Sequence, residues 1–104
     1  MNEIALLMDA LKSYLKSNGL KVLSLAKATG QKYVNIALRG LFWYYTPTID
    51  YPKLMNIVEK LVSDEKAKLK LEKLGIIIVK LDEEYYLKME VLTLERLVKE
   101  ALKS

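Results

Sequence analysis

The chain has 104 residues, 52% of them hydrophobic, and carries a net charge of +4 at pH 7. This length and this apolar content are typical of one folded domain with a single core. Because the sequence contains neither cysteine nor histidine, it excludes disulfides, thiol catalysis, cysteine-ligated metals and histidine general bases.

The first residues also bear on where the protein works. Glu3 and Asp9 interrupt the N-terminal apolar stretch, which argues against a signal peptide. No apolar run approaches the length of a membrane span, so we expect no membrane association and a cytoplasmic protein. The abundance of Lys, Glu, Ile and Leu indicates a thermophilic source.

The basic residues are unevenly distributed along the chain. Residues 1–47 contain six basic and two acidic residues, whereas residues 48–104 contain eleven of each. No acidic residue lies between Asp9 and Asp50. A surface that meets phosphates needs such a surplus, which favours a nucleic-acid partner for the first half. The alternative is a mildly basic, solvated surface without a partner.

The first helix is expected over residues 3–17. Its apolar residues recur with the period of a helix that buries one face, and Asn18-Gly19 provides a glycine stop signal. The buried stripe consists of Ile4, Leu7, Met8, Leu11 and Leu15.

A helix-turn-helix is predicted over residues 23–40, with helices near 22–29 and 32–39. Ala26 is small where the two helices must approach, Gly30 permits a positive φ in the turn, and Ile36 lies on the inner side of the second helix. Leu25 is also expected to face inward. This spacing resembles the DNA-binding motif of Cro/C1-type phage repressors and related prokaryotic and archaeal regulators. The resemblance implies that the helix near 31–39 lies in the major groove.

The side chains of this second helix suit DNA chemically. Asparagine pairs with adenine, arginine pairs with guanine, and lysine and tyrosine hold phosphates. The predicted DNA-binding residues are Lys27, Gln31, Lys32, Tyr33, Asn35 and Arg39.

Further helices are expected after an aromatic run at residues 42–45. Residues 48–62 form an amphipathic helix with Pro52 in its first turn. Residues 63–74 are charged and helical by propensity, and they either continue that helix or begin a new one after Ser63-Asp64. Gly75 ends this segment.

The chain then switches to the period of strands. Residues 76–79 are all β-branched, residues 82–84 suit a turn, and residues 85–91 alternate apolar with polar side chains, which together predict a hairpin. Thr93 caps a final amphipathic helix.

A second resemblance competes with the first. Leu71, Glu72, Lys73, Leu74 and Gly75 are similar to the junction between recognition helix and wing in winged-helix regulators of the MarR or PadR type. The helix 63–74 would then enter the groove with Lys66, Lys68, Lys70 and Lys73. The acidic tip formed by Asp82, Glu83 and Glu84 opposes this alternative, because carboxylates are repelled by phosphates.

These patterns predict a mainly α fold with a small β-hairpin. Residues 1–68 form the helix-turn-helix bundle, and residues 69–104 form the hairpin and C-terminal helix, within one compact domain. We expect sequence-specific binding to double-stranded DNA by a small transcriptional regulator. The alternative is a protein-interaction module, a small adaptor or inhibitor without DNA binding. No pattern indicates an enzyme, a cofactor or a metal site.

A homodimer is expected through the hairpin and the C-terminal helix. Side chains alternate between the two faces of a strand, so Ile77, Val79 and Leu81 point away from Ile76 and Ile78. One face packs on the domain, and an identical subunit is the simplest cover for the other. In the alternative, a monomer, the helix 48–62 covers that face.

Overall fold

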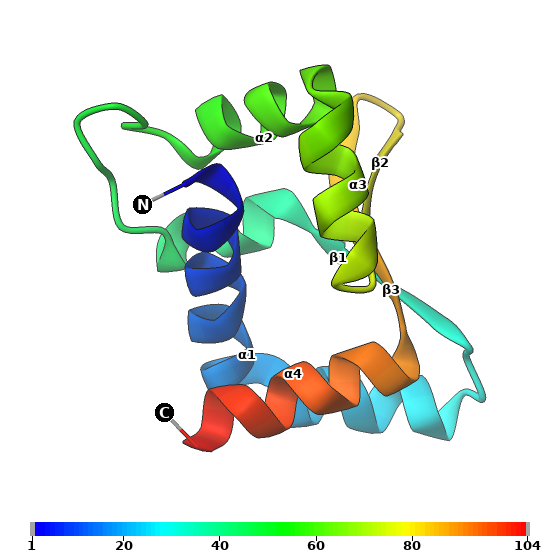
Figure 1. Cartoon of the computed structure of the whole chain (residues 1–104). Helices are drawn as coiled ribbons and strands as arrows, with labels where there is room; N and C mark the ends of the chain where they lie inside the picture. Colours follow the sequence, from blue (N-terminus) through cyan, green and yellow to red (C-terminus); the bar gives the residue numbers. More distant parts are fainter. Residues whose placement is uncertain (1, 104) are drawn as a thin grey trace.

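The computed structural model describes residues 2–103 and confirms a mainly helical chain with a small antiparallel sheet and a C-terminal helix (Figure 1). The elements in chain order are α1 (Glu3–Ala28), β1 (Tyr33–Ala37), the 3-10 helix η1 (Leu38–Tyr44), α2 (Leu54–Ser63), α3 (Glu65–Lys73), β2 (Ile76–Leu81), β3 (Glu84–Glu90) and α4 (Val91–Lys103). No helix among the described residues is long and apolar enough to span a bilayer.

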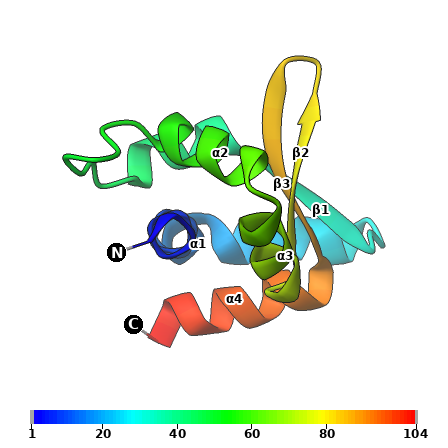
Figure 2. The same ribbon diagram turned by 45° about the horizontal axis from the view of Figure 1, so that its top comes forward.

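The first helix is longer than the sequence predicted. α1 continues through Asn18-Gly19 to Ala28, so the expected stop at residues 18–19 and the separate helix at 22–29 are both wrong. The helix instead changes direction midway, and Figure 2 shows its first part end-on and its second part from the side. Gly19 is buried, and a Cβ atom there would lie 2.8 Å from Cγ2 of Val98. The glycine therefore lets α4 pack closely against α1 instead of ending the helix.

The predicted recognition helix is absent. Residues 33–37 form the strand β1, which pairs antiparallel with β3, and no helix-turn-helix exists at residues 23–40. Val34 and Ile36 are buried and alternate with the exposed Tyr33 and Asn35, which is the period of a strand. β-Branched residues at alternate positions favour such a half-buried strand over a helix.

Within residues 23–40, some of the predicted burial and backbone features are confirmed and others are wrong. Ala26 is buried and Gly30 has a φ of +67°, but Gly30 follows the end of α1 instead of joining two helices. Leu25, which was expected to face inward, has 59% of its surface exposed. Ile36 is buried as predicted, although it lies on a strand.

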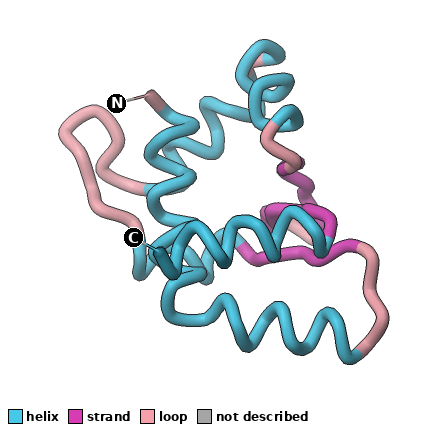
Figure 3. The backbone as a smooth tube through the Cα atoms, turned by 60° about the horizontal axis from the view of Figure 1, so that its bottom comes forward, coloured by secondary structure: helices cyan, strands magenta, loops and turns pink. Residues whose placement is uncertain are grey.

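The three strands lie in the order β1-β3-β2, so a strand from the first third of the chain completes the C-terminal hairpin. Val34, Met89 and Ile76 share one row of the sheet, and Ile36, Leu87 and Ile78 share the next. These rows face the hydrophobic core. The second half of α1 lies beside α4 in the same core (Figure 3). The segments 1–68 and 69–104 therefore share one sheet and one core.

The helix pair before the hairpin differs from the prediction only at its start. The expected helix 48–62 begins at Leu54, because Thr48 accepts a hydrogen bond from the backbone of Tyr51 and holds a loop there. Asp64 caps the new helix α3, whose length matches the alternative that starts after Ser63-Asp64. The loop 46–53 is visible at the left of Figure 1.

The C-terminal half confirms the hairpin and the final helix. β2 and β3 pair over six consecutive residues and meet at a two-residue turn, Asp82-Glu83. The hairpin extends beyond the helices (Figure 2). Gly75, with a φ of +88°, separates α3 from β2, as the sequence predicted. α4 begins at Val91, two residues before the predicted cap at Thr93.

Candidate nucleic-acid interface

The residues predicted to bind DNA do not lie on a common helix. Lys27 is in the last turn of α1 and its ammonium group pairs with the carboxylate of Glu95 on α4. Gln31 is exposed in the connection between α1 and β1. Neither residue is presented by an element that could enter a groove.

The other four predicted residues gather along β1. Tyr33 and Asn35 point to the sheet face that is turned away from the core. Two ammonium groups lie over the Tyr33 ring, that of Lys32 at 5.6 Å from its centroid and that of Lys88 at 5.0 Å. Arg39 follows in η1, 2.8 Å from a carboxylate oxygen of Glu84. This arrangement is a mixed polar surface with an aromatic ring, and it lacks the projecting shape of a recognition helix.

The charge surplus of the first half is partly neutralised by folding. Lys12, Lys27 and Arg39 each form an ion pair with a glutamate from the second half. Their partners are Glu100, Glu95 and Glu84, respectively. At least these three of the six basic residues in positions 1–47 are therefore paired with the protein's own carboxylates.

Two of these glutamates, Glu95 and Glu84, also take part in contacts that shift a pKa. The hydrogen bond and the charge of Lys27 lower the pKa of Glu95 below its ordinary value. Glu84 accepts a hydrogen bond from the hydroxyl of Tyr86 at 3.1 Å, and this contact raises the pKa of that tyrosine. The contact with Lys27 therefore stabilises the charged form of the Glu95 carboxylate.

The helix α3 carries a second basic surface. Asp64 begins it by accepting hydrogen bonds from the backbone N–H groups of Lys66 and Ala67, at 3.0 and 3.4 Å. Leu71 is buried and fixes which side of the helix faces the core. Positions i, i+3, i+4 and i+7 share one face of a helix, so the outward face, which we call the α3 face, is defined by four residues. They are Lys66, Leu69, Lys70 and Lys73, all exposed.

The lysines of the α3 face are available for an external partner. Within residues 2–103, Lys66, Lys70 and Lys73 form no ion pair, whereas Lys68 is half-buried and lies 3.7 Å from Glu65. The sequence patterns ranked this helix second, because the acidic tip at residues 82–84 and the carboxylates of Glu65 and Glu72 on the helix itself would be repelled by phosphates. The signal that favours α3 is local: a strong cap at Asp64 followed by lysines at helical spacing.

The tip of the hairpin is acidic and lies close to basic groups. Asp82 and Glu83 have φ angles of 49° and 67°, as a tight turn between twisted strands requires. Lys80 lies 3.7 Å from Glu83, and Arg39 pairs with Glu84 as described above. The carboxylates of the tip are therefore partly balanced but remain a poor match for phosphates.

Two hollows flank η1, one apolar and one with a mixed lining. One, of about 250 Å³, is lined mainly by Phe42, Tyr45, Pro47, Pro52 and Met55. The other, of about 190 Å³, shares Phe42 and Met55 with it and reaches the hairpin. Among the described residues, no group of three or more acidic side chains is placed to hold a metal ion.

No family model, curated protein or solved structure matches this chain. Arguments about its function therefore start from the chemistry of these surfaces.

Proposed function

We propose that the protein is a small cytoplasmic regulator that binds double-stranded DNA, with α3 lying in the major groove. The observation that carries the proposal is the α3 face, where Lys66, Lys70 and Lys73 project on one side and form no ion pair with any described residue. The helix pair α2–α3 followed by a hairpin also resembles the order of elements in winged-helix regulators. The α3 face therefore replaces the helix near 31–39 in the proposal.

The chemistry of the α3 face favours contacts with phosphates. Lysine ammonium groups neutralise phosphates and release counterions, which gives affinity that falls with salt. Lys66 and Lys70 are one helical turn apart, so both reach the same side of a groove. Leu69 lies between them and can contact a thymine methyl group. The acidic tip at Asp82-Glu83 is expected to stay clear of the DNA backbone.

The proposal is tested by measuring fluorescence anisotropy of a labelled duplex at several salt concentrations. The variant K66A/K70A/K73A should bind at least about tenfold more weakly, with a log–log salt slope lower by roughly one unit per lost phosphate contact. The control K21A/K99A/K103A removes the same charge from exposed positions on α1 and α4 and should lose much less affinity.

Equal affinities for the α3 variant and its control would remove α3 from the interface. Sequence specificity is tested separately, by competing a genomic fragment that binds against an unrelated duplex. A regulator requires a clear preference for one fragment at physiological salt.

A protein-interaction module without DNA binding is the second candidate, and exposed apolar side chains favour it. Trp43 has 90% and Ile49 has 100% of its surface exposed, and Phe42 beside Trp43 is 47% exposed. Large exposed apolar side chains gathered on one region are typical of protein contacts. No binding to any duplex at low salt, together with a loss of partner binding in W43A, would favour this function over the first.

The homodimer expected through the hairpin and the C-terminal helix also stays part of the proposal. Ile77 and Leu81 on the hairpin are 47% and 52% exposed, and Leu92 on α4 is 74% exposed. A dimer presents two copies of α3 to half-sites about one helical turn apart. Sedimentation equilibrium over a range of concentrations tests this state, and a protein that stays monomeric both free and on DNA would exclude it.

A further inference from the structure

We infer that two copies of the chain join by antiparallel pairing of their β2 strands, which creates one continuous six-stranded sheet. The inference deepens the homodimer proposed above, because it names the joining surface and its register. It does not depend on DNA binding.

The first argument is the free backbone edge of β2. In the order β1-β3-β2, this strand pairs with β3 on one side, and no other described strand lies on its second side. The pairing with β3 is regular over Ile76–Leu81, without a bulge. An edge strand exposes unpaired N–H and C=O groups, and proteins that avoid pairing interrupt such edges with proline, bulges or charges. Lys80 is the one charged residue of β2.

The second argument is the symmetry of the outward side chains of β2. Ile77, Val79 and Leu81 lie on the sheet face turned away from the core. They are evenly spaced, so a two-fold axis at Val79 places that residue opposite its copy and Ile77 opposite Leu81 of the second copy. Directly opposed residues in an antiparallel pair have Cβ atoms about 4.5–5.5 Å apart and bury apolar surface against each other. The exposed apolar stripe is thereby covered by an identical stripe.

The third point is charge. In this register the turn Asp82-Glu83 of one copy lies beside the start of β2 in the other, where the adjoining side of α3 carries both Lys68 and Glu72. The charges there are mixed, and they leave Lys70 and Lys73 on the α3 face. In the same register Lys80 lies opposite Ile78, away from its own copy.

The expected strength follows from the size of the contact. Pairing of one strand of six residues covers less surface than the roughly 800 Å² per partner of a standard stable interface. The isolated dimer should therefore dissociate at concentrations of roughly 10–100 µM. Because the pairing is weak, its detection requires measurements that extend well above this range.

The test substitutes Val79, because this residue lies on the proposed two-fold axis and therefore faces its own copy. Sedimentation equilibrium should show that V79K and V79E each weaken the dimer by more than about tenfold, since each places like charges opposite one another. An equimolar mixture of the two variants should dimerise again, because opposite charges then meet. Circular dichroism and the recovery in the mixture show that both variants fold.

Two further variants locate the interface. I49K changes an apolar residue that is fully exposed in the loop 46–53, and it should leave the dimer intact. L92K changes the exposed leucine of α4, the other part of the surface proposed above, and it should weaken the dimer less than V79K does. If L92K abolishes the dimer and V79K has no effect, the protein dimerises through α4, and the pairing of β2 strands is wrong.

Disulfide cross-linking between introduced cysteines tests the register, because the sequence has no native cysteine that could compete. V79C should form an intermolecular disulfide readily, whereas I77C alone should not, because Ile77 faces Leu81 of the second copy instead of itself. Equal cross-linking of the two variants would overturn the register. A wild-type chain that remains monomeric well above 100 µM, about the upper limit expected for so small a contact, would overturn the inference entirely.

Discussion

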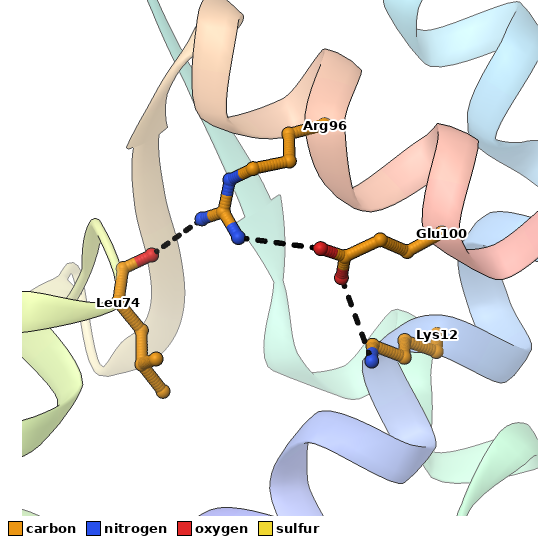
Figure 4. A network of polar contacts seen from close by, with 4 residues as sticks. All are labelled: Lys12, Leu74, Arg96 and Glu100. Carbon is orange, nitrogen blue, oxygen red and sulfur yellow. Dashed lines mark hydrogen bonds and ion pairs between the residues drawn. The ribbon is translucent and has the colours of Figure 1, made fainter.

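The guanidinium group of Arg96 on α4 donates a hydrogen bond to the carbonyl oxygen of Leu74 at 3.1 Å, where α3 gives way to β2 (Figure 4). The same guanidinium lies 3.5 Å from Glu100, which in turn lies 3.5 Å from the ammonium group of Lys12 on α1. Two helices, α4 and α1, are thus tied to the end of the proposed DNA-contacting helix. This network holds the end of α3 and involves none of the lysines of the α3 face.

Removing the guanidinium should loosen this junction. Arg96→Met keeps the apolar stem but leaves the Leu74 carbonyl without its donor, so we expect the free energy of unfolding to fall by about 1 kcal/mol. The ion pair with Glu100 adds little, because both side chains are about half exposed. Urea denaturation measures the change, with Lys103→Met at the end of the same helix as the control. Equal midpoints for the two variants would show that the hydrogen bond does not stabilise the fold.

The close packing at Gly19 predicts a steric effect. In Gly19→Ala the new methyl group meets Cγ2 of Val98 at 2.8 Å, and overpacking of this kind costs roughly 1–3 kcal/mol. The gain in helix propensity, at most about 1 kcal/mol, offsets only part of it. Gly40→Ala, whose Cβ would meet no atom closer than 3.8 Å, is the control.

The same clash makes a second variant informative. Val98→Ala should cost less in a chain that carries Gly19→Ala than in the wild type, because the smaller side chain relieves the contact. Additive effects of the two substitutions in urea denaturation would mean that α1 and α4 do not approach as closely as described.

The hairpin turn should be open to stabilisation. Glu83 has a φ of 67°, a conformation that costs an L-residue about 1 kcal/mol and a glycine almost nothing. Glu83→Gly is therefore expected to raise the thermal midpoint, although it removes the exposed contact with Lys80. Glu90→Gly, a glycine placed within β3, should lower it. A lower midpoint for Glu83→Gly as well would contradict the turn geometry.

The contact between Lys27 and Glu95 predicts a dependence on pH. Because the pKa of Glu95 is lowered in the folded state, the contact stabilises the fold above the unfolded pKa of about 4.3 and is lost as the pH falls through the lower folded value. Lys27→Met should be less stable than the wild type at neutral pH, and the difference should vanish in acid.

Carboxyl NMR titration of Glu95 gives a direct check of that contact. In Lys27→Met its midpoint should rise towards the ordinary value, whereas Lys103→Met should leave it unchanged. An unchanged midpoint in Lys27→Met would show that another group lowers the pKa.

Local patterns determined those parts of the fold that depend on neighbouring residues. The hairpin followed from the β-branched run at Ile76–Val79 and from the alternation after Tyr85. The cap at Asp64 and the glycine at Gly75 bounded α3 within a residue or two. In each case a side chain or a φ preference acts on the backbone within a few positions, so one sequence window contains the whole cause.

Long-range contacts decided the rest, and with it the location of the candidate site. Ile36 suits the inner face of either a helix or a strand, and pairing of β1 with β3, some fifty residues later, selected the strand, in which Val34 is buried on the same face. α1 runs past Asn18-Gly19 because Gly19 packs against Val98, a contact that no local stop signal contains.

The pairing of charged side chains also depended on contacts between residues that are far apart in the sequence. Lys27 appeared available for phosphate until Glu95, 68 residues away, was brought to it. The sequence by itself therefore determined α3, the hairpin, the C-terminal helix and the types of the charged residues, but not the length of α1 or the strand β1. Only the tertiary structure decided which basic groups remain unpaired, because opposite charges combine by proximity in space and not by order along the chain.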